Sequence, residues 1–230
     1  GDTHYKETLS EMEKTYEDDY TTFLYTHPAQ AHANEKAPQP SGDFTRSIEK
    51  AQKAIQLRSI KKKPKKKSGK KNDAAYKAWM KRDEYNPFLH NAWMMMGRSQ
   101  FMNGDFLGSA STFFYISKHF TWLPETVTES KLWQARSYCS MDWLYEAEVI
   151  ITRIKQDDLT NKKLKYLYNV TYADYLIKSG KYEQSVDYLK NAVNFTSGAQ
   201  KSRLNFLLGQ VYTRIGKKAE AYKAYGDAGK

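Results

Sequence analysis

The sequence predicts an all-α fold of stacked helical hairpins, and three observations lead to this prediction. A set of residues at spacing 3, 4, 3 recurs four times, with offsets of 38, 38 and 36 residues between sets. That spacing follows one face of a helix. A second amphipathic stretch lies about ten residues before each set, and turn-forming residues separate the two. A repeat of this length built from two helices is typical of a repeat protein.

Each set has a small residue, serine or alanine, in its second position, where a neighbouring helix must approach closely. The sets are Phe106, Ser109, Phe113 and Ile116; Leu144, Ala147, Ile151 and Ile154; Tyr182, Ser185, Leu189 and Ala192; and Lys218, Ala221, Tyr225 and Ala228. The turns before them are Asn103-Gly104-Asp105, Met141-Asp142, Ser179-Gly180-Lys181 and Ile215-Gly216-Lys217. Glycine in three of these turns fits the left-handed residue that ends many helices.

The N-terminal third, residues 1–58, is less regular. Apolar residues from Leu9 to Leu24 predict a helix within residues 3–25, and residues 27–40 form a polar loop with Pro and Ala. The second-helix pattern returns weakly over residues 42–58, which predicts a degenerate fifth unit. Its pattern residues are Gly42, Phe44, Ser47, Ala51 and Ala54.

A lysine-rich segment follows at residues 59–72 and separates this third from four repeats at 73–230, which begin with a helix at about 73–84. It has no apolar residue after Ile60, so it is predicted to be disordered or an exposed loop. The nine basic residues of the segment and its border are Arg58, Lys61, Lys62, Lys63, Lys65, Lys66, Lys67, Lys70 and Lys71. Without them, 37 basic residues become 28 against 26 acidic ones, so the net charge falls from +11 to +2. The segment is therefore a solvated insertion, a contact for an anionic membrane or envelope polyanion, or a nuclear-import or nucleic-acid element. It has no interleaved aromatic residue, which disfavours nucleic acid.

The sequence offers no candidate catalytic residue, metal ligand or cofactor site. Cys139 is a single cysteine and the five histidines are scattered, so neither a disulfide nor a multi-thiolate metal site is expected. No phosphate-binding loop, nucleophile elbow or HExxH motif occurs. The mean hydropathy is −0.81 and no run of about 18 apolar residues occurs, which excludes a membrane-spanning helix from this sequence. We therefore expect no enzyme and no small-molecule substrate.

The repeat positions resemble the tetratricopeptide repeat, whose pattern alternates aromatic, glycine and alanine positions. The first unit matches at Trp93, Gly97, Gly104, Phe106 and Phe113, and the last at Leu208, Gly209, Tyr212, Gly216, Ala221 and Ala228. Serine replaces the preferred alanine at Ser109 and Ser185, and Lys218 stands in an aromatic position. The resemblance implies a superhelix of α-hairpins with a concave groove.

The same resemblance assigns residues of each first helix to that groove. They are Asn91, Met94, Arg98, Phe101, Glu129, Arg136, Asp174, Lys178, Arg203, Phe206, Gln210 and Arg214. Their charge is net basic, with apolar positions between, which suits an extended or helical peptide with acidic side chains or a free carboxylate. An ordinary solvated surface is the alternative.

Two longer stretches carry a closer resemblance. They are the runs GRSQFMNGDFLGSASTFFYI and WQARSYCSMDWLYEAE, within residues 79–120 and 132–150. Together with residues 47–63 they resemble the N-terminal part of the tetratricopeptide lipoprotein of the Bacteroidetes type IX secretion and gliding-motility apparatus, over residues 44–150. This resemblance implies an outer-membrane lipoprotein that faces the periplasm, anchored through a cysteine outside this sequence. A cytoplasmic location is the alternative.

Together these observations predict a non-catalytic scaffold for protein–protein interaction that assists a secretion, motility or other outer-membrane assembly. The alternative function is binding of a polyanion or an anionic membrane surface through residues 58–71.

Overall fold

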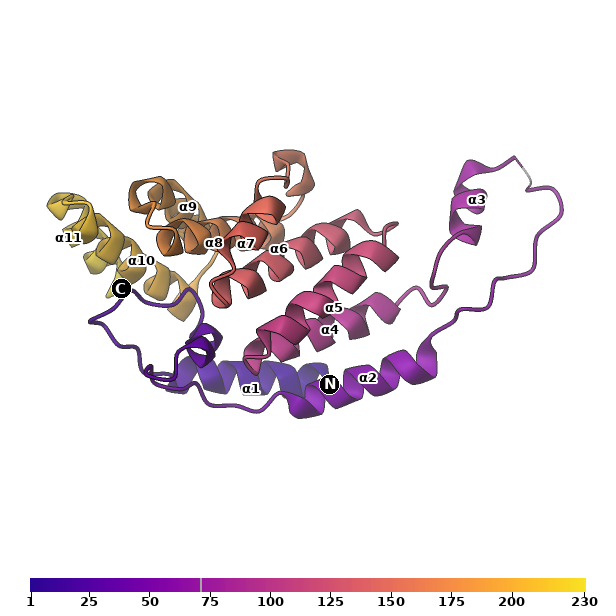
Figure 1. The fold of residues 1–230 in the computed structure, drawn as a ribbon, viewed down its shortest axis with the longest axis horizontal. Coiled ribbons are helices and arrows are strands. Elements are labelled where there is room, and N and C mark those ends of the chain that lie inside the picture. The colour runs from indigo at the N-terminus through magenta and orange to yellow at the C-terminus, as the bar shows by residue number, and fades with distance from the viewer. Residues whose placement is uncertain (71) are drawn as a thin grey trace.

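The computed structural model describes residues 1–70 and 72–230, in which every element of regular structure is a helix (Figure 1). Lys71 of the basic segment lies outside these residues. The elements are α1 (Asp2–Thr15), η1 (Pro28–Ala33), α2 (Thr45–Arg58), α3 (Ala74–Met80), α4 (Leu89–Met102), α5 (Phe106–His119), α6 (Pro124–Ser140), α7 (Leu144–Ile151), η2 (Gln156–Asp158), α8 (Lys162–Lys178), α9 (Tyr182–Asn194), α10 (Gly198–Arg214) and α11 (Lys218–Ala228).

From α4 onward the helices pack in consecutive pairs, α4 with α5, α6 with α7, α8 with α9 and α10 with α11. This confirms the predicted all-α fold and its helical hairpins. Each pair also contacts the next, so the pairs form one row (Figure 1). At the start of the row α2 packs on α4, although a long insertion separates the two helices in the sequence.

The four hairpin turns share one backbone conformation. Gly104, Gly180 and Gly216 have φ angles of 79°, 73° and 79°, and Asp142 holds the equivalent place with a φ of 58°. Glycine adopts this left-handed conformation without steric cost, and aspartate tolerates it better than most residues.

Small residues set the distance between the two helices of a pair. A Cβ atom added to Gly97 would lie 2.7 Å from the Phe113 ring, and one added to Gly209 would lie 2.6 Å from the Tyr225 ring. The Ser109 hydroxyl donates a hydrogen bond of 2.8 Å to the Gly97 carbonyl. Larger side chains at the two glycines would therefore push the paired helices apart.

One predicted helix is wrong in its extent: α1 ends at Thr15 and does not continue to residue 25. Tyr16 is already extended, with a ψ of 125°. Asp18 and Asp19 would place negative charge at the C-terminal end of the helix dipole, which is unfavourable there. Asp19 instead accepts hydrogen bonds from the amide and hydroxyl of Thr21, which closes a local turn.

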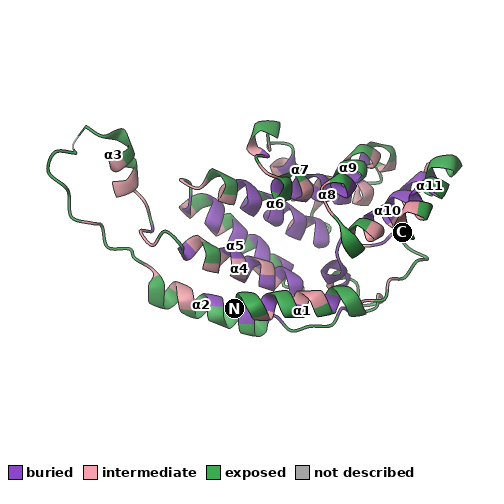
Figure 2. Cartoon of the chain, turned by 180° about the vertical axis from the view of Figure 1, so that it is seen from behind, coloured by how far each residue is buried: buried purple, intermediate pink, exposed green. Residues whose placement is uncertain are grey.

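The core is continuous along the row. Phe101, Phe113 and Trp133 form a ring cluster that joins α4, α5 and α6, with ring centroids 5.2 Å and 5.8 Å from that of Trp133. Buried leucines on the first helices, such as Leu164 and Leu204, continue it toward α11. In Figure 2 the buried residues lie along the inside of the row, while α3 and its connections are largely exposed.

Candidate functional site

Between α1 and α2 the chain crosses the row of paired helices as a largely irregular segment that contains η1, residues 16–44, which we call the strap. It contacts the first helices of the pairs, which are α4, α6, α8 and α10, and we call that face the inner face. The strap meets α10 first and reaches the end of α4 last, so it runs against the order of the repeats. Figure 1 shows it between α1 and the C-terminal pairs.

At α10 two amide side chains bind the main chain of the strap. The Gln210 amide nitrogen donates to the Thr22 carbonyl over 2.6 Å, and its oxygen accepts from the Leu24 amide over 2.9 Å. The Gln200 amide nitrogen donates to the Thr26 carbonyl over 2.7 Å. These bonds recognise an extended backbone whatever its side chains are.

Side chains add selectivity at this end. Asp18 pairs with Arg203, and the two side chains are only 10% and 11% exposed. The Phe23 ring stacks on Tyr182 with centroids 5.4 Å apart, and the Arg214 guanidinium lies 6.0 Å and 5.0 Å from the two rings. This end of the inner face therefore binds a carboxylate, that of Asp18, and an aromatic ring five residues later in the strap, that of Phe23.

The polar side chain of Gln30 is deeply buried in the strap, with 1% of the residue exposed. Its amide nitrogen donates to Asp174 over 2.8 Å and to Ser140 over 3.1 Å. Its oxygen accepts from the Thr26 hydroxyl over 2.6 Å and from the His27 amide over 3.1 Å. Both donor positions and both acceptor positions of this amide are therefore used, which fixes the strap across α6 and α8.

His27 is buried in the strap as a neutral ring. Its Nδ1 accepts from the Ala29 amide over 3.1 Å, so Nε2 carries the proton and donates to Glu13 over 3.2 Å. Burial lowers the pKa of His27, and the Glu13 hydrogen bond offsets only part of that effect.

The end of the strap is fixed to the first hairpin. The His32 ring lies 3.2 Å from the Met102 carbonyl, and the Phe44 amide donates to the Asn103 side chain over 2.8 Å. A Cβ atom on Gly104 would lie 2.5 Å from His32. The glycine of the first turn therefore also makes room for the strap.

Six of the twelve predicted groove residues contact the strap. Arg136, 3% exposed, donates to the Thr26 hydroxyl over 3.3 Å, and Phe206 meets the Tyr20 ring edge-on with centroids 4.9 Å apart. The other four that contact it are Asp174, Arg203, Gln210 and Arg214.

The other six have different surroundings. Arg98 lies 5.8 Å from the Tyr5 ring of α1 and 3.7 Å from Glu129, which also pairs with Lys163 at 2.9 Å. Lys178 lies 3.5 Å from Asp142 and donates to the Cys139 carbonyl. Burial would lower the pKa of Lys178, but Asp174 and Asp142 outweigh it and the pKa is raised. Met94 and Phe101 are core residues, and Asn91 is exposed.

The inner face is therefore occupied by the chain's own segment, and its charges are largely paired within the chain. The occupant has the charge predicted for a partner, because the strap has five acidic residues against one lysine. Sequence reasoning did not identify the strap, Gln200 or Asn103 as part of the site. Gln200 carries a signal that could have identified it, because it lies three residues before Arg203 on the same face of α10.

The sequence matches no protein-family model and no curated protein. Within residues 1–70 and 72–230, no three His, Cys, Asp or Glu side chains gather closely enough to hold a metal ion. The same residues include no helix with the length and apolar character needed to cross a membrane.

Proposed function

We propose that the protein is a non-catalytic scaffold of the tetratricopeptide type, whose inner face binds an extended acidic segment of another protein. The observation that carries this proposal is the strap itself, which the inner face holds through main-chain hydrogen bonds, an ion pair and an aromatic stack. The common left-handed turns and the glycine–aromatic contacts within pairs support the tetratricopeptide architecture.

A partner must compete with the strap for this face. The strap is tethered at both ends, so it binds at a high effective concentration and shields the face from weak partners. We expect a partner to begin displacing the strap at the end that contacts α10. A cleft of about 410 Å³ remains between strap and α10, lined by residues that include Arg203 and Phe206, and Tyr20 beside it is 62% exposed.

A peptide-exchange experiment tests the proposal. The substitutions Asp18→Ala and Phe23→Ala in the full chain remove the side-chain contacts of the strap with Arg203 of α10 and Tyr182 of α9, and change no residue of the paired helices. We expect this variant to bind a labelled peptide of residues 16–33, measured by fluorescence anisotropy, and the wild-type chain to bind it far more weakly because its own strap competes.

The matched control is the same peptide with Asp18→Ala and Phe23→Ala. Faster hydrogen exchange at Thr22 to Thr26 must show that the strap of the variant has loosened. Circular dichroism must show that the helices of the variant are intact. If such a variant binds the wild-type and the substituted peptide equally, or binds neither, the inner face is not a peptide-recognition surface and the proposal fails.

We also propose that this scaffold is an outer-membrane lipoprotein facing the periplasm and assisting a secretion or motility assembly. The proposal rests on the resemblance of residues 79–120 and 132–150. Cys139 is fully buried, and burial raises the pKa of its thiol, so a lipid would have to be attached elsewhere. Fractionation of host cells, with metabolic labelling by a fatty acid, tests this location; an unlabelled protein in the cytoplasmic fraction would contradict it.

A further inference from the structure

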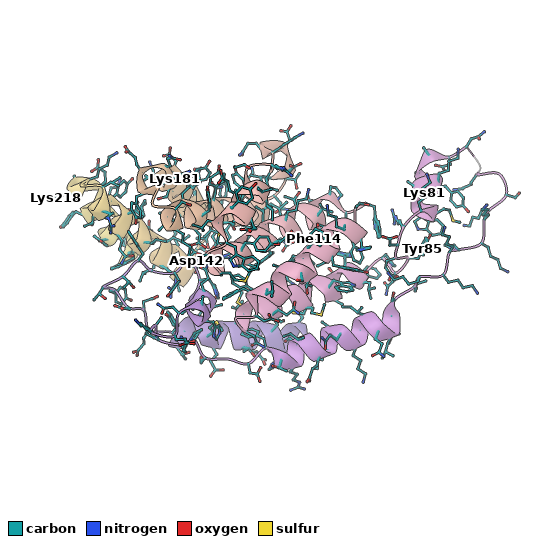
Figure 3. The ribbon with its side chains drawn as sticks, viewed as in Figure 1. Lys81, Tyr85, Phe114, Asp142, Lys181 and Lys218 are labelled. Atoms are coloured by element: carbon teal, nitrogen blue, oxygen red, sulfur yellow. The ribbon has the colours of Figure 1, made fainter. Side chains whose placement is uncertain are left out.

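The insertion between α2 and α4 forms a projection, described over residues 59–70 and 72–85, which we call the arm. Figure 1 shows α3 and its two connecting segments set apart from the row of helices, and Figure 2 shows that most of this region is exposed. Lys81 and Tyr85 mark it in Figure 3. The arm belongs to neither the inner face nor the strap.

Buried hydrogen bonds fix the root of the arm. The Tyr85 amide donates to the Ile60 carbonyl over 2.9 Å, which joins the two connecting segments. The Glu84 carboxylate, 2% exposed, accepts from the Ser59 hydroxyl and the Ile60 amide over 2.6 Å each. It also accepts from the Asn86 amide over 2.8 Å. The arm therefore leaves the body at a defined point.

Aromatic residues hold α3 against the connecting segments. The Tyr76 hydroxyl accepts from the Lys67 amide over 2.8 Å, and the Tyr85 hydroxyl donates to the Met80 carbonyl over 2.8 Å. The Trp79 ring lies between the two tyrosines, with centroids 5.8 Å and 5.5 Å away. These rings are half-buried against one another, so the lysines form the outer surface of the arm.

The outer surface of the arm is strongly positive around one cleft. A cleft of about 630 Å³ is lined by Lys63, Lys66, Lys67, Lys70, Lys77 and Lys81, together with Ser68, Tyr76 and Met80. Among the residues that the structure describes, no acidic side chain lines this cleft. Asp73 caps α3 by accepting from the Tyr76 amide, and Asp83 lies 2.8 Å from His119. Among the described residues no carboxylate lies within ion-pair distance of these six lysines.

We propose that the arm docks the protein on the surface of an anionic phospholipid membrane, with its lysines against the lipid phosphates. Clustered lysines bind such surfaces as point charges without fixed geometry. Leu57 and Phe88, 65% and 72% exposed at the two helix ends beside the root, supply apolar side chains that a membrane interface accepts.

The arm is less suited to nucleic acid. Single-stranded binders stack bases on exposed aromatic rings, whereas Tyr76, Trp79 and Tyr85 pack on one another. Duplex readers commonly use arginine as a two-pronged donor to guanine, whereas the charged residues described in the cleft are all lysines. The membrane is therefore the better match to this charge distribution.

Co-sedimentation of the full chain with lipid vesicles tests the proposal. The vesicles contain roughly 30% phosphatidylglycerol in phosphatidylcholine, with pure phosphatidylcholine for comparison. We expect binding to the anionic vesicles only, lost when salt rises from ~0.05 M to ~0.5 M. The triple variant Lys63→Gln, Lys66→Gln and Lys67→Gln should lower the partition coefficient by about 100-fold, at about fivefold per lysine.

The matched control removes the same charge from the body through Lys190→Gln, Lys217→Gln and Lys223→Gln, three exposed lysines on or beside α9 and α11. The fold-loss in partition coefficient of this control should be less than a tenth of the fold-loss of the arm variant. Equal losses in the two triple variants would mean that net charge alone attracts the protein, and would overturn the proposal. Tighter arm-dependent binding to a single-stranded oligonucleotide than to the vesicles at the same salt would overturn it in favour of nucleic acid.

Discussion

The strap and the arm are both long departures from the repeating hairpins, yet one folds onto the body and the other projects from it. Residues 16–44 have five acidic residues and one lysine, and residues 59–85 have eleven basic and three acidic residues. The net charge is therefore −4 for the strap and +8 for the arm, and the rest of the chain has a net charge of +7. Attraction favours docking of the strap on the body, and repulsion disfavours docking of the arm.

Side-chain type adds to this difference. The strap carries Thr, Gln, His and aromatic side chains, which can be buried once their few polar atoms are paired, as those of Thr26 and Gln30 are. A lysine cluster cannot be buried without a matching cluster of carboxylates. Charge and hydrogen-bond pairing therefore both favour the strap over the arm as the segment that packs on the body.

The largest effect is expected from Gln30→Ala in the strap. The substitution leaves the Asp174 carboxylate buried without its amide donor, which should cost about 2–4 kcal/mol of unfolding free energy. Urea denaturation followed by circular dichroism measures the change. Lys66→Ala in the arm is the matched comparison and should change the free energy by less than about 0.5 kcal/mol. Equal losses from the two substitutions would show that the strap is not a structural part of the body.

A smaller, local effect is expected at the root of the arm from Glu84→Gln. Burial alone would raise the pKa of Glu84, but its hydroxyl and amide donors outweigh it and the pKa is lowered. The neutral amide loses charge-assisted hydrogen bonds worth about 1–2 kcal/mol. Hydrogen exchange should quicken at Ile60 and Tyr85 while exchange at Leu24 in the strap stays unchanged. Faster exchange in both regions would mean that the arm and the strap unfold together.

The paired helices could be predicted because their apolar residues recur at helical spacing, and this periodicity depends only on near neighbours in the sequence. The strap could not, because its partners are far away: Gln30 bonds to Asp174, and Leu24 to Gln210. Tyr16, Tyr20 and Phe23 even fit the spacing of a helix, which produced the wrong extension of α1. In the structure Tyr20 and Phe23 are placed by Phe206 and Tyr182, on different helices.

The candidate site was predicted in part for the same reason. The resemblance to the tetratricopeptide repeat assigned residues such as Arg203 and Gln210 to the groove, because it implies which side of each first helix faces inward. It could not report that the chain's own strap covers that face. The charge of the arm, in contrast, was readable directly, since it depends on composition and not on a distant partner.

Acid should loosen the strap and leave the arm unchanged. The folded pKa of His27 lies below the usual 6.5, so below about pH 6.5 the unfolded chain binds a proton that the folded chain resists, and unfolding free energy falls with pH. The loss approaches about 1.4 kcal/mol per pH unit below that value. Glu13, Arg136 and Arg203 surround the ring, and the two arginines oppose its protonation.

This is measured as hydrogen exchange at Thr26 and Ala29 between pH 7 and pH 5.5, corrected for intrinsic exchange rates. His27→Gln keeps an acceptor for the Ala29 amide but does not titrate, so its strap should show a much weaker pH dependence. An unchanged pH dependence in that variant would assign the effect to a carboxylate instead of His27.

The smallest effect, and the only expected gain in stability, lies in the arm. Lys66 and Lys67 line the same cleft as four other lysines, so their mutual repulsion is present in the folded protein and is relieved when the chain expands. Lys66→Gln with Lys67→Gln should therefore raise the unfolding free energy by about 0.2–0.5 kcal/mol at low salt. The gain should vanish at ~0.5 M salt, where the repulsion is screened. A gain that persists there would arise from packing against Tyr76, and the charge argument that separates the arm from the strap would then be wrong.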